Sequence, residues 1–271
     1  MKKLLVTGGS GFIGSHFINL VKKEYAVTNW DIKTGYDIRS SLPKKSFDYV
    51  VHFASLRSIP AGELDPRAYI DNNCWGIVNL LRQFPDSRFI NISSSSVQNV
   101  FSVYAATKQF AESMTLKHKN SLNVRLHNVF GEGQPFNSGT CVAQFIECKI
   151  NNQIPVIYGG GDQKRDFTYV QDVVIELKRL MEDKMIGTTH VGYGTSASVL
   201  DMLKGVFGYM PQVKYSPQRD FMNIMDSKSP RSMKAPYGRL RGIKRTVEWY
   251  ENHYGRVQPH RLKKKTHTTI H

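Results

Sequence analysis

A serine run, a tyrosine and a lysine stand close together in ISSSSVQNVFSVYAATK, residues 92–108. Tyr104 and Lys108 are four residues apart, so a helix would place both side chains on one face. A phenol, with an ordinary pKa of about 10, is a poor base at neutral pH, but a neighbouring positive charge favours the phenolate. This spacing indicates a site where Tyr104 takes a proton from an alcohol or sugar hydroxyl while a serine holds the same oxygen. Alone, it equally fits a packed tyrosine and a solvated lysine.

A glycine-rich stretch near the N-terminus gives that spacing a context. TGGSGFIGS, residues 7–15, follows the apolar segment LLV and precedes a segment with helical periodicity. A tight glycine turn there lets the backbone approach a pyrophosphate, and the helix N-terminus supplies N–H groups and the positive end of its dipole. The glycines fit two registers, Gly9/Gly11/Gly14 or Gly8/Gly11/Gly14. The stretch predicts a dinucleotide site, so that Tyr104 would act while a hydride moves to or from a nicotinamide.

The segment YAVTNWD ends at Asp31, at about the 20-residue distance from the glycines that is usual for a ribose-binding carboxylate. A carboxylate in this place accepts hydrogen bonds from both ribose hydroxyls and repels a 2′-phosphate. Asp31 therefore favours NAD over NADP as the cofactor. The alternative is that Asp31 only caps a turn.

The elements that must position these residues alternate along the chain. Alternation of strands and helices predicts an α/β protein of Rossmann type, with a doubly wound parallel sheet and helices on both faces. The end of a strand such as FINISS is where ligands bind in such a sheet, which places a serine beside the cofactor. Helices are expected near residues 12–23, 66–82 and 104–118, and strands in KKLLVTG, YAVTNWD, DYVVHFA, SRFINISS and LNVRLHNVF.

Past residue 130 glycine and proline become frequent and the predicted elements become short. We therefore expect a small α+β substrate lobe after the sheet domain. The expected division is an NAD-binding domain over 1–130, to which 166–193 returns, and a lobe over 131–165 and 194–255. Residues 256–271 form a basic tail that we expect to be disordered.

Composition limits the function classes. The net charge is +15, and residues 228–271 hold twelve Lys or Arg against two Glu. Such a surface attracts nucleic acid, a membrane or an anionic small substrate, or is only a solvated basic face. No apolar run approaches the length of about 20 residues that a membrane span needs. The three cysteines lack CxxC spacing, so we expect no disulfide framework, no metal site and a cytoplasmic location.

These motifs together resemble the extended short-chain dehydrogenase/reductases, and within them the NAD-dependent epimerase/dehydratase family, most of all its UDP-glucose 4-epimerases. TGGSGFIGS is similar to the family's TGxxGxxG, HFASLR at 52–57 to its HFAGLK, and YIDNNCWG at 69–76 to its YxDNNVxG. SSSSV, YAATK and RDFTYVQDV at 165–173 are similar to its SSSxxV, YxxxK and RDYxxVxD. The resemblance covers nearly the whole chain.

The resemblance implies a role for individual residues. It selects the register Gly8/Gly11/Gly14, makes Ser94 the catalytic serine beside Tyr104 and Lys108, and puts Asn128 on the substrate. It assigns Arg165 and Arg219 to the substrate diphosphate, although each alone equally fits a surface salt bridge. The implied cofactor contacts are Gly8, Gly11, Phe12, Ile13, Gly14, Asp31, Asp37, Ile38, Phe53, Ala54, Arg57, Asn73, Tyr104, Lys108 and His127.

The implied activity is an NAD-dependent C4 epimerisation of a nucleotide sugar, a UDP-sugar before others, by transient oxidation to a 4-keto sugar. Family members that are 4,6-dehydratases carry an Asp-Glu pair after the catalytic serine or threonine. Here Ser95 and Ser96 stand in those places, and neither hydroxyl has a useful pKa for acid–base work. A nucleotide-sugar 4-reductase or 4,6-dehydratase is the first alternative. A catalytically silent dinucleotide-binding module with a basic interaction tail is the second.

Two further expectations concern the surroundings of the site. Only nine residues separate Ser94 from Tyr104, where the family usually has a longer loop over the substrate, which leaves the site open or completed by a partner subunit. The resemblance implies a homodimer through the helices near 66–82 and 104–118, whose apolar residues include Ile77, Leu80, Leu81, Phe110 and Met114. The same face could instead pack on the sheet within one subunit. No membrane partner and no nucleic acid are expected.

Overall fold

A six-stranded parallel sheet forms the centre of the molecule in the computed structural model, which describes residues 1–40, 42–217 and 228–255. The strand order is β10-β5-β4-β3-β1-β2, and every neighbouring pair is parallel. This order reverses on either side of β1, as in a doubly wound sheet, so the α/β Rossmann-type prediction is confirmed. The strands are β1 (Lys3–Thr7), β2 (Ala26–Trp30), β3 (Tyr49–His52), β4 (Arg88–Ser94), β5 (Ser121–Leu126) and β10 (Gly187–Val191).

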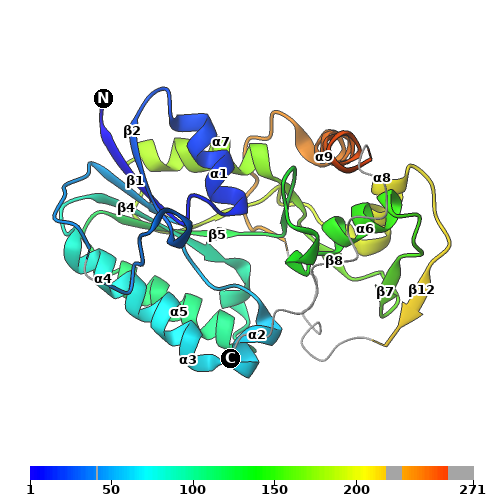
Figure 1. Cartoon of the computed structure of the whole chain (residues 1–271), viewed down its shortest axis with the longest axis horizontal. Coiled ribbons are helices and arrows are strands. Elements are labelled where there is room, and N and C mark those ends of the chain that lie inside the picture. The colour runs from blue at the N-terminus through cyan, green and yellow to red at the C-terminus, as the bar shows by residue number, and fades with distance from the viewer. Residues whose placement is uncertain (41, 218–227, 256–271) are drawn as a thin grey trace.

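Helices cover both faces of this sheet (Figure 1). On one face lie α1 (Phe12–Val21) and α7 (Val170–Glu182), which pack against each other. On the other lie α4 (Gly76–Gln83) and α5 (Val103–Thr115), with α2 (Ile59–Leu64) and α3 (Pro66–Tyr69) beside them. Short helical turns complete this part as η1 (Ile32–Thr34), η2 (Ile70–Trp75) and η3 (Ser95–Gln98).

The core follows the alternation of side chains along each strand. Leu4 and Val6 of β1 belong to the cluster beneath α1 and α7, together with Phe17 and Val173. Leu5 belongs to the opposite cluster, which also holds Ile77, Leu80 and Phe89. Burial on both faces explains why these strands read as continuous apolar runs.

A second group of elements lies beyond the carboxyl ends of the strands (Figure 1). It consists of small paired strands and three longer helices. The pairs are β6 (Val129–Phe130) with β9 (Thr168–Tyr169), β7 (Val156–Tyr158) with β12 (Lys214–Ser216), and β8 (Lys164–Arg165) with β11 (Ala197–Ser198). The helices are α6 (Cys141–Ile150), α8 (Val199–Phe207) and α9 (Gly238–Tyr254), with the turn η4 (Phe136–Ser138).

The structure differs from the predicted elements in two places. The predicted strand 122–130 is two strands, because β5 ends at Leu126 and β6 pairs with β9 outside the main sheet. The predicted helix 66–82 contains a π-helical stretch, η2, which includes Asn73. Such stretches often mark functional sites within helices.

The chain returns to the sheet after the small strands, through α7 and β10. The described part of the chain contains no helix with both the length and the apolarity needed to cross a bilayer. The proposed tail 256–271 and Arg219 lie outside the described residues.

Candidate active site

A cavity of about 650 Å³ opens at the carboxyl ends of the central strands. It is lined by the loop after β1, the ends of β2, β3, β4 and β5, the first turns of α5, and the segment after β6. Most of the residues singled out from the sequence line it. They are Gly8, Gly11, Phe12, Ile13, Gly14, Asp31, Asp37, Ile38, Phe53, Ala54, Arg57, Ser94, Tyr104, Lys108, His127 and Asn128.

The glycine loop forms the floor of one end of this cavity. Gly8 has a φ of +70°, a conformation that side chains with a Cβ rarely adopt. A Cβ on Gly14 would lie 2.5 Å from the carbonyl oxygen of Gly8, closer than real contacts allow. The N–H of Gly11 donates to the same carbonyl at 3.1 Å. The three glycines of the register Gly8/Gly11/Gly14 therefore make one tight turn into α1.

Two polar side chains at the end of β2 hold this loop. Asn29 accepts a hydrogen bond from the N–H of Gly9 and donates one to the hydroxyl of Ser10, both at 3.1 Å. The Asp31 carboxylate accepts the N–H groups of Ser10 at 3.0 Å and Lys33 at 2.9 Å. Asp31 caps the turn η1, which the alternative interpretation of this residue predicted. A carboxylate has about four acceptor positions, so it retains capacity for ribose hydroxyls from its place on the cavity wall.

Asp37 and Ile38 line the cavity beyond Asp31. Asp37 is paired with the guanidinium of Arg39 at 2.6 Å, and this contact holds the pKa of the Asp37 carboxyl below its usual range. Ile38 is buried and packs beneath Gly76, where a Cβ would lie 2.6 Å from its side chain. Gly76 is therefore the residue that lets α4 approach this wall.

The serine, the tyrosine and the lysine meet at the other end of the cavity. Ser94 is the last residue of β4, and its hydroxyl contacts the Ser96 hydroxyl at 2.9 Å and accepts the N–H of Ser96 at 3.2 Å. Tyr104 and Lys108 lie on the first turns of α5, which begins after Ser102, whose hydroxyl caps the helix at the N–H of Ala105. The buried Lys108 ammonium donates to the carbonyl of Ile92 at 2.6 Å.

Burial and the neighbouring charges shift the pKa values of Lys108 and Tyr104 in opposite directions. Burial lowers the pKa of Lys108 to about 8, against the negative charge of Glu112. Burial also raises the pKa of the Tyr104 phenol, while a hydrogen bond with Ser94 and the positive charge of Arg57 act to lower it. The spacing of the sequence predicts Lys108 as the cation near Tyr104. The structure adds Arg57, whose guanidinium donates to the carbonyl of Ser138 at 3.1 Å.

Two predicted site residues, Asn73 and Arg165, are not part of the cavity lining. Asn73 is buried and uses its amide to hold the cavity loop, because it accepts the N–H of Leu56 at 2.8 Å and donates to the Leu56 carbonyl at 2.9 Å. Arg165 lies on β8, outside the cavity lining, and donates to the carbonyl of Lys164 at 2.7 Å. Arg219 is outside the described residues.

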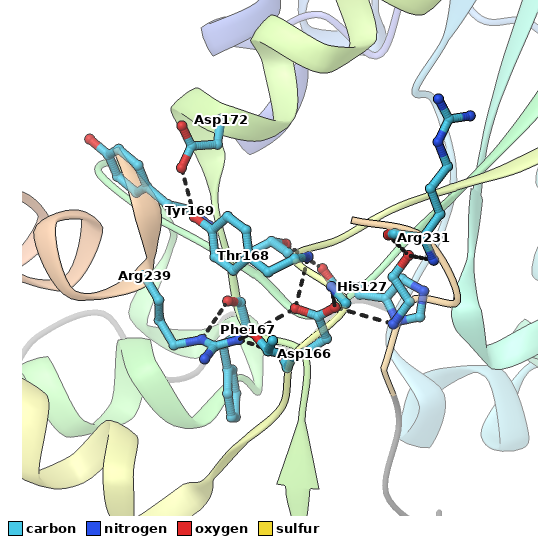
Figure 2. Close-up of polar contacts among 12 residues, drawn as sticks. His127, Asp166, Phe167, Thr168, Tyr169, Asp172, Arg231 and Arg239 are labelled. Carbon is cyan, nitrogen blue, oxygen red and sulfur yellow. Dashed lines mark hydrogen bonds and ion pairs between the residues drawn. The ribbon is translucent and has the colours of Figure 1, made fainter. Parts of the chain in front are cut away.

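Two buried carboxylates, Asp166 and Asp172, connect segments that are distant in the sequence (Figure 2). Asp166 accepts the N–H groups of Tyr193, Gly194 and Ser229, between 2.9 and 3.1 Å. Asp172 accepts the hydroxyl of Tyr193 and the N–H groups of Tyr237 and Gly238, between 2.7 and 3.0 Å. These contacts hold the segment after β10 and the segment that leads into α9 against the chain around α7.

His127 stands at the carboxyl end of β5, fully buried beside the cavity. Its carbonyl accepts the Thr168 hydroxyl at 2.7 Å, and its ring contacts His190 at 3.1 Å (Figure 2 shows its place beside Asp166). Burial lowers the pKa of His127 to about 4, despite the opposing charge of Asp166. The imidazole is therefore neutral at physiological pH.

Sequence reasoning missed several residues of the site. Gln134 and Thr140 line the cavity from the segment after β6, and Ser96 contacts Ser94. The GEGQP stretch marked only a turn, so nothing in its composition placed a glutamine here. Asn29 had a usable signal, since it lies on the strand end two residues before Asp31.

The residues present fit NAD. The glycine turn leaves no room for a Cβ where a pyrophosphate must approach α1, and Asp31 faces the position of a ribose. In the described part of the chain, Asp31 and Asp37 are the only carboxylates that line the cavity, both on the side of β2. The end that holds Ser94, Tyr104 and Lys108 has hydroxyl and cationic groups instead.

Comparison with known proteins identifies the family. The profile of the NAD dependent epimerase/dehydratase family matches residues 4–191, more than half of the chain. The chain belongs to this family. The resemblance inferred from the motifs is confirmed, and the family's cofactor is NAD.

Individual relatives show the range within the family. The solved UDP-N-acetylglucosamine 4-epimerase from Methanobrevibacter ruminantium M1, in complex with UDP-N-acetylmuramic acid, is 25% identical; the match covers 93% of this chain and 99% of that one, with a TM-score of 0.83. MoeE5, solved with UDP-glucose and NAD, is 25% identical with the same coverage and a TM-score of 0.80. The GDP-6-deoxy-D-talose 4-dehydrogenase of Aggregatibacter actinomycetemcomitans is 28% identical, over 70% of this chain and 76% of its own length.

Proposed function

We propose that the protein is an NAD-dependent epimerase that inverts C4 of a UDP-sugar. The observation that carries the proposal is that Ser94, Tyr104 and Lys108 line one cavity with the glycine loop and Asp31. A nucleotide site and a hydroxyl-activating site are thereby adjacent. Two relatives solved with UDP-linked ligands support the choice of nucleotide.

The cofactor half of the cavity has a clear division of labour. The N–H groups at the start of α1 take the pyrophosphate, and Asp31 takes the ribose hydroxyls. Asp37, Ile38, Phe53, Ala54 and Arg57 line the remaining wall, and Asn73 keeps the loop over residues 54–57 in place. His127, neutral and buried, closes the end near β5.

When bound, NAD would supply the nicotinamide ring for reversible hydride transfer with C4 of the sugar. The chain's own residues handle the proton of the C4 hydroxyl: the Tyr104 phenolate removes it, and Ser94 holds the oxygen from which it leaves. The charge of Arg57 acts to lower the pKa of the phenol, and Lys108, one helical turn along α5, would add a second positive charge near the phenolate. After the sugar has turned in the cavity, Tyr104 returns the proton to the same oxygen.

The end of the cavity that would receive the sugar distinguishes epimerisation from dehydration. Elimination of water between C5 and C6 needs a positioned acid and base. Ser95 and Ser96 line this end and supply hydroxyl groups alone. We therefore place the 4,6-dehydratase and the 4-reductase second, and the silent binding module after them because both Tyr104 and Lys108 are present.

The proposal extends to the diphosphate and to the assembly. We assign Asn128, Arg165 and Arg219 to the substrate, with the arginines on its diphosphate. We also propose a cytoplasmic homodimer. Ile77 and Leu80 do not contribute to its interface, since both are buried against the sheet. Trp75 and Phe110, about half exposed at 49% and 41% on neighbouring elements, are the apolar residues that a second copy would cover.

The first test is turnover of nucleotide sugars by the purified protein with no cofactor added. We expect UDP-glucose and UDP-galactose, or their N-acetyl forms, to interconvert, because NAD is regenerated in every cycle. NMR of the sugar anomeric protons measures both directions. Tyr104→Phe should lower kcat by about 10²–10⁴, the usual contribution of a positioned base.

The matched control is Tyr25→Phe, which removes a phenol hydroxyl bonded to Glu182 at 2.6 Å outside the cavity lining. It should leave kcat unchanged. A 4-keto-6-deoxy product would show that the protein is a 4,6-dehydratase, and net consumption of NADH or NADPH would show that it is a 4-reductase. A salt-dependent complex with DNA, lost on removing 256–271, together with no turnover, would favour the silent module. GDP-sugars test whether the nucleotide assignment is right.

A further inference from the structure

One buried carboxylate ties together the elements that carry the proposed catalytic residues. Glu112 lies on α5 and is 5% exposed. Its carboxylate accepts the Ser93 hydroxyl at 2.6 Å and the Arg125 guanidinium at 2.9 and 2.7 Å. Its main-chain carbonyl accepts the Asn123 amide at 3.1 Å. Glu112 therefore joins α5 to both β4 and β5.

Two of these contacts are made with residues close in sequence to residues of the site. Ser93 immediately precedes Ser94, and Arg125 lies two residues before His127. Glu112 is one helical turn after Lys108, so the two side chains share a face at about 5–6 Å between Cβ atoms. Lys108 in turn donates to the carbonyl of Ile92 on β4. The spacing between the serine and the lysine is thus set through β4 and α5, which Glu112 connects.

Glu112 also supplies the nearest negative charge. Burial lowers the pKa of Lys108, and the charge of Glu112 opposes that change. Among the described residues, Tyr104 lies one helical turn before Lys108 on α5, and His52 lies on β3, where burial and then the charge of Lys108 lower its pKa. His52 is buried against Thr7, and its pKa is about 3, so it carries no charge at working pH. Arg125 lies behind Glu112 and Arg57 acts on Tyr104.

We propose that Glu112 is a positioning residue that fixes the spacing of Ser94 and Lys108 and keeps Lys108 charged. Glu112 is not among the residues that line the cavity. It acts through Lys108, whose ammonium has three donors, of which two can still reach a ligand after the contact with Ile92. The consequence for turnover rests on the proposed function, whereas the charge state of Lys108 does not.

The decisive measurement is the titration of Lys108 itself by NMR, in protein labelled at lysine Cε, with the signal assigned from Lys108→Arg. Glu112→Gln should move the midpoint to lower pH, because a lysine is charged below its pKa and the change removes a stabilising negative charge. A nearby opposite charge shifts a pKa by about one unit or more. In active enzyme, with a midpoint that starts at about 8, the ratio of kcat at pH 8 to kcat at pH 6.5 should therefore fall about fourfold or more.

Two variants separate charge from structure. Ser93→Ala removes a hydrogen bond to Glu112 but keeps its charge, so the Lys108 midpoint should not move. Glu176→Gln is the matched control: Glu176 is 6% exposed on α7 and binds Arg179 in the same two-bond geometry, at 2.9 and 2.7 Å, outside the cavity lining. It should leave both the midpoint and the activity ratio unchanged.

The double variant Glu112→Gln with Arg125→Gln leaves no unpaired charge, and keeps the test available if the single variant is unstable. An unchanged Lys108 midpoint in Glu112→Gln would overturn the proposal, and so would equal midpoints in the double variant and in Arg125→Gln alone, a comparison that isolates the charge of Glu112. So would an equal shift in Ser93→Ala, because the effect would then come from geometry alone. A shifted midpoint in a protein that turns over no UDP-sugar would support the role of Glu112 and count against the proposed function.

Discussion

At the scale of single residues, the site shows how little separates a structural contact from a functional one. Asp31 caps the turn η1 and holds Ser10 of the glycine loop, yet it also faces the cavity. Asn73, which was predicted to touch the cofactor, holds the main chain of Leu56 and is not part of the cavity lining. Residue type and spacing therefore located the site, but did not show which atoms face it.

Asp31→Ala tests the cofactor preference. A charge-assisted hydrogen bond contributes about 1.5–3 kcal/mol, so NAD should bind about 10- to 100-fold more weakly. The variant also no longer repels a 2′-phosphate, so the preference for NAD over NADP should shrink. Titration calorimetry with both dinucleotides measures this.

The control for Asp31→Ala is Asp48→Ala. Asp48 accepts one backbone N–H, that of Lys3 at 2.7 Å, at the opposite end of the strands. Its affinity for NAD should match that of the unaltered protein. An Asp31→Ala protein with full NAD affinity and full discrimination would show that the carboxylate only caps the turn.

At the scale of elements, local pattern was sufficient wherever one strand or helix carried the signal alone. The strands around Val6, Val51 and Ile90 are apolar on both faces and were predicted from that pattern. The π-helical stretch around Asn73 was not, because it is set by contacts with Leu56 and Thr107, far away in the sequence. The split after Leu126 likewise depends on pairing with Thr168.

Gly14→Ala tests the turn that joins β1 to α1. The new Cβ would meet the Gly8 oxygen at 2.5 Å and the Gly9 Cα at 2.8 Å, and both are main-chain atoms that cannot rotate away. We expect a loss of about 1–3 kcal/mol of folding stability, as for other overpacked sites. NAD affinity should fall at least about tenfold, a change of roughly 1.4 kcal/mol.

Thermal unfolding and NAD titration measure these two effects, with Ser15→Ala as the control on the next residue. Ser15 loses only a hydroxyl that donates to the Phe12 carbonyl at 2.9 Å. Wild-type NAD affinity in Gly14→Ala would mean that the cofactor does not use this turn.

At the scale of the whole molecule, the sequence predicted a sheet domain and a lobe, but not the contacts between segments that are distant in the chain. Asp166 and Asp172 both lie within the RDFTYVQDV stretch. Their carboxylates accept hydrogen bonds from the main-chain N–H groups of Ser229 and Gly238, which are more than 60 residues away in the sequence. No local pattern predicts such partners. The proposed homodimer also depends on the whole fold, because only the folded subunit shows which apolar side chains remain exposed.

Trp75→Glu combined with Phe110→Glu tests the proposed homodimer. Two buried charges without partners destabilise an apolar interface, so the variant should be monomeric where the unaltered protein has twice the mass of one chain. Light scattering after size-exclusion chromatography distinguishes the two. Leu240→Glu is the control, because Leu240 is 80% exposed on α9, away from η2 and α5. Unaltered protein that elutes as a monomer at micromolar concentration would refute the dimer.

The late return of the chain through α7 and β10 also governs how the protein can be made. A ribosome that has released only residues 1–130 has delivered the nucleotide motif with its Gly8, Gly11 and Gly14, but not Val173, Val174 and Leu177, which cover the apolar surface beside Phe17. The nascent fragment therefore exposes apolar surface until about sixty further residues, from 131 to the end of β10 at 191, have been synthesised. During this interval the nascent chain is open to chaperone binding and aggregation. For the same reason we expect that a fragment of residues 1–130 does not fold on its own into a nucleotide-binding domain.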